Sequence, residues 1–438
     1  MLAATTRRAF ASLSNSAAKA YSTAATTTQI STAQNGIKVA SIEEPGQAAG
    51  LSVVINGGSR LESSSGVAHF LKNYGFKNNS KRTAFRVTRE TELAGGVLSA
   101  NLTRETISYS AEFLNGDAAQ FAEVLGDVVS NQKFQPHEFV DVAKQTAAES
   151  SAAAHSAEVA VLEAAHRAAF RTGLGNAIFA NPNARINNDA VKAYAAELFQ
   201  SGNIALVGSG IPLEAVQEFA ETFINVPAGN VSRQASKYYG GEVRVESSVD
   251  GKSHYILAFE GAPLNSNEYA AAQVLRFALG GEQRVQNAAA AGLLGEAAAK
   301  LGQDAQLKAF NIGYSDAGLF GVYASAPSSS VASAVAAAAE QLKAVSKGIS
   351  EQDFAAAVAQ AKFAASNAFE TRLDRLETIG AQALFDGKYT SVAEVAAALD
   401  NVSTSDVAKV AEKLLSGKAT GAAVGELYSL PYADSLSL

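Results

Sequence analysis

The sequence contains no cysteine, no tryptophan, a single methionine and only 8 prolines among 438 residues. The absence of cysteine excludes disulfides, thiolate metal sites, iron–sulfur clusters and a cysteine nucleophile. Any metal ion would therefore need histidine or carboxylate ligands. The histidines available for that role are His69, His137, His155, His166 and His254.

Long apolar runs and an excess of positive charge are also missing. The nearest approach to an uninterrupted apolar stretch, residues 331–339, is short and mostly alanine, so we expect no membrane-spanning helix. The net charge of −7 argues against a nucleic-acid partner. The sequence has no phosphate-binding loop of the GxxxxGK[ST] type and no GxSxG serine elbow.

The first part of the chain differs in composition from the rest. Residues 1–21 are basic and rich in Ser, Thr and Ala, and the first acidic residue of the chain is Glu43. This composition is typical of a mitochondrial transit peptide, whereas a secretory signal would need an apolar core of about 7 to 15 residues. We predict a transit peptide that is cleaved near Tyr21, with a disordered basic tail as the alternative.

An internal repeat with an offset of 215 to 217 residues covers nearly all of the remaining chain. Residues 121–150 predict an amphipathic helix, a loop and a second helix, and residues 335–366 repeat this plan. Residues 187–210 likewise match residues 403–426, each predicting a helix followed by a short strand. The residues expected to cap these two helices are Asp189 and Asp406.

Strand signals precede the helical pair in each half, at residues 51–55, 106–114, 255–259 and 319–324. The pattern therefore predicts an α+β fold made twice, each half a sheet with helices on one face. We predict an N-terminal domain over residues 22–224, a linker over 225–239 and a C-terminal domain over 240–438. Residues 280–302 are rich in alanine but flanked by glycines, and they are compatible with a loop that contains a helix.

Residues 66–83 contain an altered metal motif. They resemble the inverted zinc motif His-x-x-Glu-His of the pitrilysin-like metallopeptidases, whose members are also built from duplicated α+β halves. In that motif two histidines on one helix face bind zinc, the glutamate activates water, and a distant glutamate is the third ligand. Here His69 keeps the first position, Lys72 replaces the glutamate, Asn73 replaces the second histidine, and Glu149 matches the third-ligand region.

Two of the four functional groups of the motif are thus replaced. An ammonium group at Lys72 would repel Zn²⁺, and the amide of Asn73 is a poor zinc ligand. We therefore expect no catalytic residue, no bound metal and no cofactor. We interpret His69 as a helix residue and Glu149 as a solvated or ion-paired surface residue.

The remaining histidines offer no substitute metal site. His155 and His166 are eleven residues apart and would share one face of a helix, but no third ligand accompanies them. We interpret this pair as part of an exposed helix face.

Within the family, the sequence is similar to one noncatalytic branch, the second core subunits of mitochondrial ubiquinol–cytochrome c reductase (respiratory complex III). The stretches that carry the similarity are residues 51–60, 66–79 and 307–321. The resemblance implies a structural and assembly subunit on the matrix side of the inner membrane. Its partners would be the first core subunit and the other complex III subunits, and those subunits would attach it to the membrane.

The sequence is also compatible with two other functions. One is the noncatalytic, presequence-binding subunit of the mitochondrial processing peptidase, which belongs to the same family. That relative has a glycine-rich loop where this chain has the alanine-rich residues 280–302, which counts against it. The other is an active peptidase, which Lys72 and Asn73 disfavour.

Overall fold

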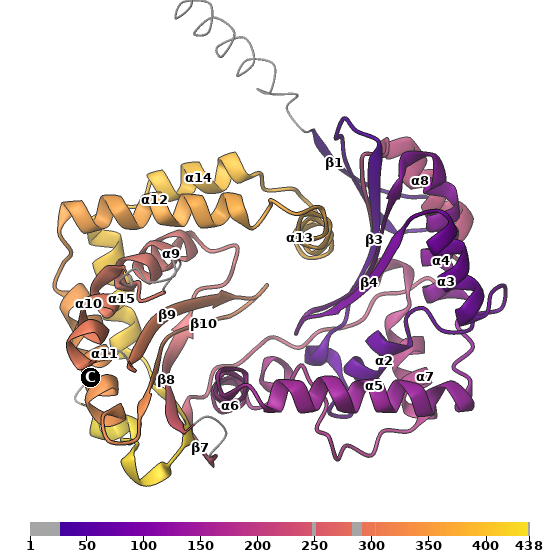
Figure 1. The fold of residues 1–438 in the computed structure, drawn as a ribbon. Coiled ribbons are helices and arrows are strands. Elements are labelled where there is room, and N and C mark those ends of the chain that lie inside the picture. Colours follow the sequence, from indigo (N-terminus) through magenta and orange to yellow (C-terminus); the bar gives the residue numbers. More distant parts are fainter. Residues whose placement is uncertain (1–26, 248–250, 283–290, 303, 437–438) are drawn as a thin grey trace, which may run out of the picture.

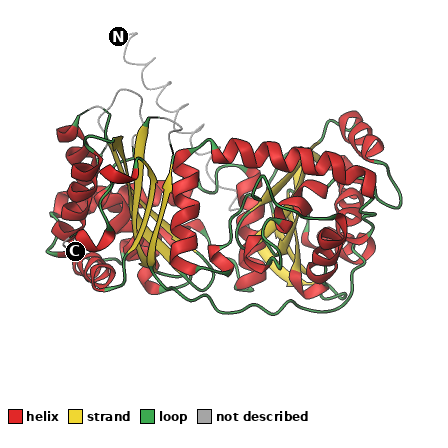
Figure 2. Cartoon of the chain, turned by 90° about the horizontal axis from the view of Figure 1, so that it is seen from below, coloured by secondary structure: helices red, strands yellow, loops and turns green. Residues whose placement is uncertain are grey.

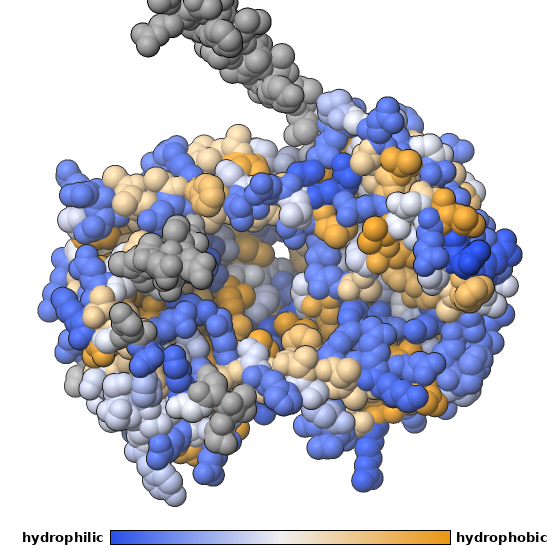
Figure 3. All heavy atoms as spheres, viewed as in Figure 1, coloured by the Kyte–Doolittle hydropathy of each residue, from blue (hydrophilic) through white to orange (hydrophobic). Residues whose placement is uncertain are grey.

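The computed structural model describes residues 27–247, 251–282, 291–302 and 304–436. They form two sheets with their helices, arranged as two halves on either side of a hollow (Figures 1 and 3). The transit peptide predicted for residues 1–21 lies outside the described residues, as do residues 283–290 of the tract 280–302.

The sheet of the N-terminal half has the strand order β1-β2-β6-β3-β5-β4 within the described chain. All neighbouring strands are antiparallel except β2 and β6, which run parallel. The predicted strands 51–55 and 106–114 are confirmed as β3 and β5. The strands are β1 (Thr28–Thr32), β2 (Lys38–Ile42), β3 (Ala48–Asn56), β4 (Val97–Leu102), β5 (Thr106–Leu114) and β6 (Ile204–Ser209).

The sheet of the C-terminal half has the order β7-β11-β8-β10-β9, which repeats the first sheet without its edge strand β1. Here β7 and β11 are the parallel pair. The predicted strands 255–259 and 319–324 lie within β8 and β10. The strands are β7 (Gly241–Glu246), β8 (Lys252–Gly261), β9 (Gln306–Gly313), β10 (Gly318–Pro327) and β11 (Thr420–Gly425).

The helices also follow the repeat, and both predicted helical pairs are confirmed, as α4–α5 and α11–α12. In the first half the α-helices are α2 (Val67–Tyr74), α3 (Ala84–Leu93), α4 (Ala118–Ser130), α5 (Pro136–Ala154), α6 (Ala157–Phe170), α7 (Asn188–Leu198) and α8 (Leu213–Phe223). In the second half they are α9 (Asn267–Leu279), α10 (Gly292–Leu301), α11 (Val331–Ser346), α12 (Glu351–Asn367), α13 (Arg372–Phe385), α14 (Val392–Asp400) and α15 (Thr404–Ser416). The alanine-rich tract thus contains a helix, α10.

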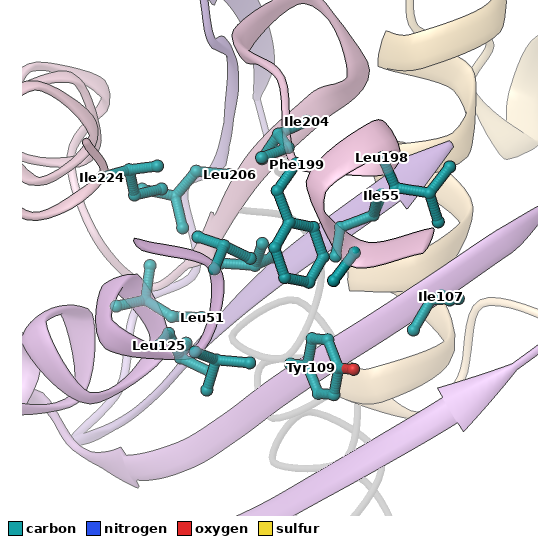
Figure 4. Close-up of a cluster of buried hydrophobic side chains, with 14 of the residues drawn as sticks. Leu51, Ile55, Ile107, Tyr109, Leu125, Leu198, Phe199, Ile204, Leu206 and Ile224 are labelled. Atoms are coloured by element: carbon teal, nitrogen blue, oxygen red, sulfur yellow. The ribbon is translucent and has the colours of Figure 1, made fainter. Parts of the chain in front are cut away.

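Each half has its own apolar core between its sheet and the helices that cover it. In the first half β3, β5 and β6 supply side chains that meet others from α4 and α7, as Figure 4 shows for Leu51, Ile55, Tyr109, Leu125 and Leu198. All five are buried. Burial of each large apolar side chain contributes about 1.5–3 kcal/mol, so these contacts fix the sheet against its helices.

The second face of each sheet is covered by a helix from the other half, which corrects the prediction of helices on one face only. Helix α6 packs on β8 and β11, and α13 packs on β2, β3 and β6. Figure 1 shows α13 beside the first sheet and α6 beside the second, and Figure 2 shows helices on either side of the strands. Gly380 lets α13 come close, because a Cβ there would lie 2.4 Å from a methyl carbon of Val54. The first residues of α6 and α13 are 215 positions apart, so the exchange is itself part of the repeat.

The predicted caps Asp189 and Asp406 were misplaced by two or three residues. The N-cap of α7 is Asn187, whose side chain accepts from the Ala190 N–H, and the N-cap of α15 is Ser403. Asp189 lies in the first turn, and Asp406 completes a capping box with Ser403. Acidic residues in the first helical turn interact favourably with the helix dipole, and therefore the sequence alone did not separate them from caps.

Candidate functional site

The short helix α2 carries the three motif positions and is held at its N-terminus by a carboxylate. Gly66 precedes the helix with a φ of 92°, a left-handed conformation that favours glycine. The side chain of Glu62 accepts the backbone N–H of Gly66 at 3.0 Å and that of Ala68 at 3.5 Å, in place of a cap from the helix itself. Burial raises the pKa of Glu62 to about 7.

The side chains of α2 that face α5 converge on a single oxygen of Glu149. His69 Nε2 lies 2.6 Å from Glu149 Oε2, Lys72 Nζ lies 2.9 Å from it, and Asn73 Nδ2 lies 3.3 Å from it. His69 and Asn73 are buried, while the side chain of Lys72 is 17% exposed and that of Glu149 is 29% exposed. The structure therefore brings together all four residues that the sequence motif singled out.

The hydrogen bonds of His69 define its protonation. Its Nδ1 accepts the backbone N–H of Ala180 at 3.2 Å, so Nε2 carries the proton and donates to Glu149. Burial lowers the pKa of His69, and the neighbouring ammonium of Lys72 acts in the same direction. His69 is therefore a neutral donor, and the positive charge next to Glu149 belongs to Lys72.

Glu149 is ionised and surrounded by donors. Burial opposes its ionisation, but hydrogen bonds from His69, Lys72 and Gln145 outweigh burial and lower the pKa of Glu149 to about 2. Gln145 Nε2 donates to Glu149 Oε1 at 3.0 Å, so both carboxylate oxygens are occupied. A carboxylate held in this way is a structural acceptor.

Asn73 is oriented by α5 so that its amide nitrogen faces Glu149. The hydroxyl of Thr146 donates to the Val142 carbonyl and accepts from Asn73 Nδ2 at 3.0 Å, while Asn73 Oδ1 accepts from Gln145 at 3.2 Å. The group at the second histidine position is thus a donor directed at the carboxylate. Together with the Lys72 ammonium, this donor set does not fit a zinc ion, which needs acceptors. Among the described residues no group of three His, Cys, Asp or Glu side chains could hold a metal ion.

The prediction of an exposed face containing His155 and His166 was wrong. They lie on two different helices, because His155 is the C-cap of α5 and Ser156 is the N-cap of α6. His166 is fully buried: its Nδ1 donates to the Leu162 carbonyl at 2.8 Å, and its Nε2 accepts from the Tyr314 hydroxyl at 2.7 Å. Burial keeps the pKa of His166 well below its usual range. It is a buried contact between the two halves.

A second polar cluster, which the sequence did not reveal as a site, joins the halves and is called here the Arg60 junction. It comprises Arg60, Glu105, Ser315 and Asp316. The guanidinium of Arg60 lies 2.6 Å from a carboxylate oxygen of Glu105 and 2.6 Å from one of Asp316, and its side chain is 3% exposed. The backbone N–H and the hydroxyl of Ser315 both donate to Glu105, at 2.9 and 2.6 Å.

The segment between the halves is tied into the Arg60 junction. The Arg60 guanidinium also donates to the carbonyl of Gln234 at 2.9 Å, and the Asp316 carboxylate accepts the backbone N–H of Ser236 at 2.8 Å. The guanidinium of Arg233 lies 4.7 Å from the centre of the Phe385 ring, at the end of α13. The sequence did contain a signal for this cluster, because Arg60 and Asp316 lie in two of the three stretches that carry the family resemblance.

Comparisons with known proteins agree with this architecture. Residues 38–182 match the family model "Insulinase (Peptidase family M16)", and residues 185–361 match "Peptidase M16 inactive domain". A protein named cytochrome b-c1 complex subunit 2, mitochondrial, from Neurospora crassa is 37% identical over 100% of this chain and 95% of its own length. The chain belongs to the cytochrome b-c1 complex subunit 2 family.

Other members of that family match over a similar extent. The human protein of the same name is 31% identical over 92% of this chain and 90% of its own length. A chain in the structure titled "Complex III2 from Candida albicans, Inz-5 bound" has the same fold, with a TM-score of 0.79, 19% identity and coverage of 91% and 95% of the two chains. The predicted resemblance to the second core subunits and the predicted fold of two peptidase-like halves are both confirmed.

Proposed function

We propose that this chain is a noncatalytic structural and assembly subunit of the mitochondrial cytochrome b-c1 complex, respiratory complex III. The observation that carries the proposal is the extent of the match: relatives with 31–37% identity cover over 90% of this chain, and each is named as subunit 2 of that complex. A shared domain alone would leave part of one chain unmatched.

The cluster of His69, Lys72, Asn73 and Glu149 between α2 and α5, called here the α2–α5 site, supports a noncatalytic role. A peptidase of this family would need zinc ligands and a general base at positions that here hold Lys72 and Asn73. We propose that His69, Lys72, Asn73 and Glu149 are the positions of a zinc motif that has lost its metal and its base. Electron transfer then belongs to partner subunits.

The subunit would lie on the matrix side of the inner membrane, beside the first core subunit. None of the helices in the described chain has the length and apolar character of a membrane span, so partner subunits would supply its attachment. We propose residues 1–21 as the transit peptide, residues 22–224 and 240–438 as the two peptidase-like domains, and residues 225–239 as their linker.

Deletion of the gene, followed by assays on isolated mitochondria, tests the proposal. We expect less assembled complex III and less quinol-dependent reduction of cytochrome c, with normal removal of presequences from imported precursors. If precursors accumulate while complex III remains normal, the chain is instead the presequence-binding subunit of the processing peptidase.

A rescue experiment tests the noncatalytic part. Complex III activity should return when the deletion is complemented with the wild-type chain and also with a Glu149→Gln variant. The purified wild-type protein should contain no stoichiometric zinc and show no peptidase activity that a chelator removes. Zinc at one equivalent together with chelator-sensitive proteolysis would establish an active peptidase.

A further inference from the structure

The charges at the α2–α5 site balance without a metal ion. Glu149 is ionised, His69 is neutral, and Lys72 is the cation whose nitrogen lies within 4 Å of the carboxylate among the described Lys and Arg residues. The Lys72 side chain is mostly buried against α5 at 17% exposure, so its ammonium is held in place. Removing one partner of an ion pair that is partly shielded from water costs more stability than breaking an exposed pair.

The direction of the hydrogen bonds is the reverse of that in a metal site. Around a zinc ion the ligands present lone pairs to a central cation. Here three N–H donors, from His69, Lys72 and Asn73, point to one oxygen of Glu149. The carboxylate has become the centre of the cluster, and the cation comes from the helix itself.

We propose that Lys72 is a built-in counter-ion that takes the place of a metal ion: it joins α2 to α5 through Glu149 and keeps divalent cations out of the site. The proposal rests on the proposed loss of the zinc motif and deepens it. It adds that the substitution at position 72 excludes metal actively, whereas the substitution at position 73 only removes a ligand.

The test separates the two positions by restoring the ligand while keeping or removing the charge. The variant Asn73→His returns a second imidazole beside His69 and Glu149. The double variant Asn73→His/Lys72→Met has the same ligands without the ammonium. Because a fixed positive charge a few ångströms from Zn²⁺ is strongly repulsive even at a partly exposed site, the double variant should bind Zn²⁺ at least ~100-fold more tightly. Competition against a chromophoric chelator measures both affinities, and elemental analysis gives the stoichiometry.

Matched controls assign the effect to this ammonium. Asn73→His/Lys77→Met removes a lysine just beyond the end of α2 and should bind Zn²⁺ like Asn73→His alone. Adding Glu149→Gln to the double variant should abolish tight binding, because the third ligand is lost. Lys72→Gln replaces Lys72→Met if the latter does not fold, as judged by circular dichroism.

The counter-ion role has its own readout in the native background. Lys72→Met should lower the melting temperature by about 1–2 °C, whereas Lys72→Arg and Lys77→Met should not. Equal zinc affinities for Asn73→His and Asn73→His/Lys72→Met would overturn the proposal. An unchanged melting temperature for Lys72→Met would overturn it as well. Neither result bears on complex III assembly, which the deletion and rescue experiments decide separately.

Discussion

The helix pairs α2–α5 and α9–α12 occupy the same place in the two halves, but they are packed by different chemistry. Helices α5 and α12 begin 215 residues apart, at Pro136 and Glu351, so the position of Glu149 corresponds to Ala364. In the second half α12 buries alanine side chains against α9, namely Ala357 and Ala361. The same scaffold therefore forms with an apolar residue at the position of Glu149, so its geometry does not require the polar cluster of the first half.

The exchanged helices show a second contrast between the halves. Helix α13 is fastened to the first sheet by polar groups as well as apolar ones. Glu377 accepts from the Ser108 hydroxyl at 2.6 Å and from the Asn101 amide at 2.7 Å. Lys38 Nζ donates to two carbonyls at the C-terminal end of α13, at 2.9 and 3.0 Å. Helix α6 contacts the second sheet mainly through alanine, valine and phenylalanine side chains, which form no hydrogen bonds.

The largest effect is expected where the two halves meet, at the Arg60 junction. Arg60→Met leaves the buried carboxylate of Glu105 without its main partner, which typically costs about 3–5 kcal/mol, and it also removes the ion pair of the more exposed Asp316. Urea unfolding of the purified full-length chain measures this loss. The matched control Arg86→Met removes an arginine whose side chain is 62% exposed and should cost less than about 1 kcal/mol. Equal effects of the two variants would show that the junction does not hold the halves together.

The second largest loss of stability is expected where α13 crosses the first sheet. Leu376 is fully buried between α13 and the first sheet, so Leu376→Ala should destabilise the chain by about 2–5 kcal/mol through lost burial and the cavity left behind. The matching change in the other crossing helix, Val161→Ala, removes fewer carbon atoms and should cost less. If Leu376→Ala has no effect on urea unfolding, α13 does not stay on the sheet of the other half in solution.

The sequence predicted the repeated elements well because apolar periodicity and turn residues record them locally. It did not predict the exchange of α6 and α13, since an apolar helix face shows that a helix is buried but does not show which sheet it covers. The approach of Lys72 to Glu149 crosses 77 positions of sequence, and only the family motif suggested it. Burial of His166 could have been expected from the alanines on either side of it, but its partner Tyr314 lies 148 residues away.

Glu62 in the first half also predicts that the stability of the chain depends on pH. It has no described counterpart in the second half. Burial raises the pKa of Glu62 to about 7 from an ordinary value of 4.5, and one of its oxygens is buried without a hydrogen-bond partner. Between these two pH values the folded state holds more protons than the unfolded state, so stability falls as pH rises through this range. Above pH 7 the loss is complete.

Glu62→Gln removes this titration while keeping an oxygen that can accept the N–H groups at the start of α2. Stability of the variant should equal that of the wild type near pH 4 and exceed it at pH 8 by up to about 3 kcal/mol, the upper bound set by the pKa difference. Thermal unfolding at a series of pH values measures the difference. A gap that does not grow between pH 4.5 and 7 would mean that Glu62 titrates normally.

The smallest effect concerns the caps of the corresponding helices α7 and α15, which use different residues for the same purpose. Asn187 accepts the Ala190 N–H at 2.8 Å, and Ser403 accepts the Asp406 N–H at 3.3 Å while Asp406 accepts the Ser403 N–H at 3.2 Å. Asn187→Ala and Ser403→Ala should each cost about 0.5–2 kcal/mol, whereas the glycine variants should cost a few tenths, because glycine leaves the exposed N–H groups open to water.

The reciprocal bond of the capping box survives Ser403→Ala, since it uses the backbone of residue 403, and so we expect the loss there to be the smaller of the two. Urea unfolding of the four variants decides the order, and a larger loss at Ser403 would show that its hydroxyl, and not the carboxylate of Asp406, organises the start of α15.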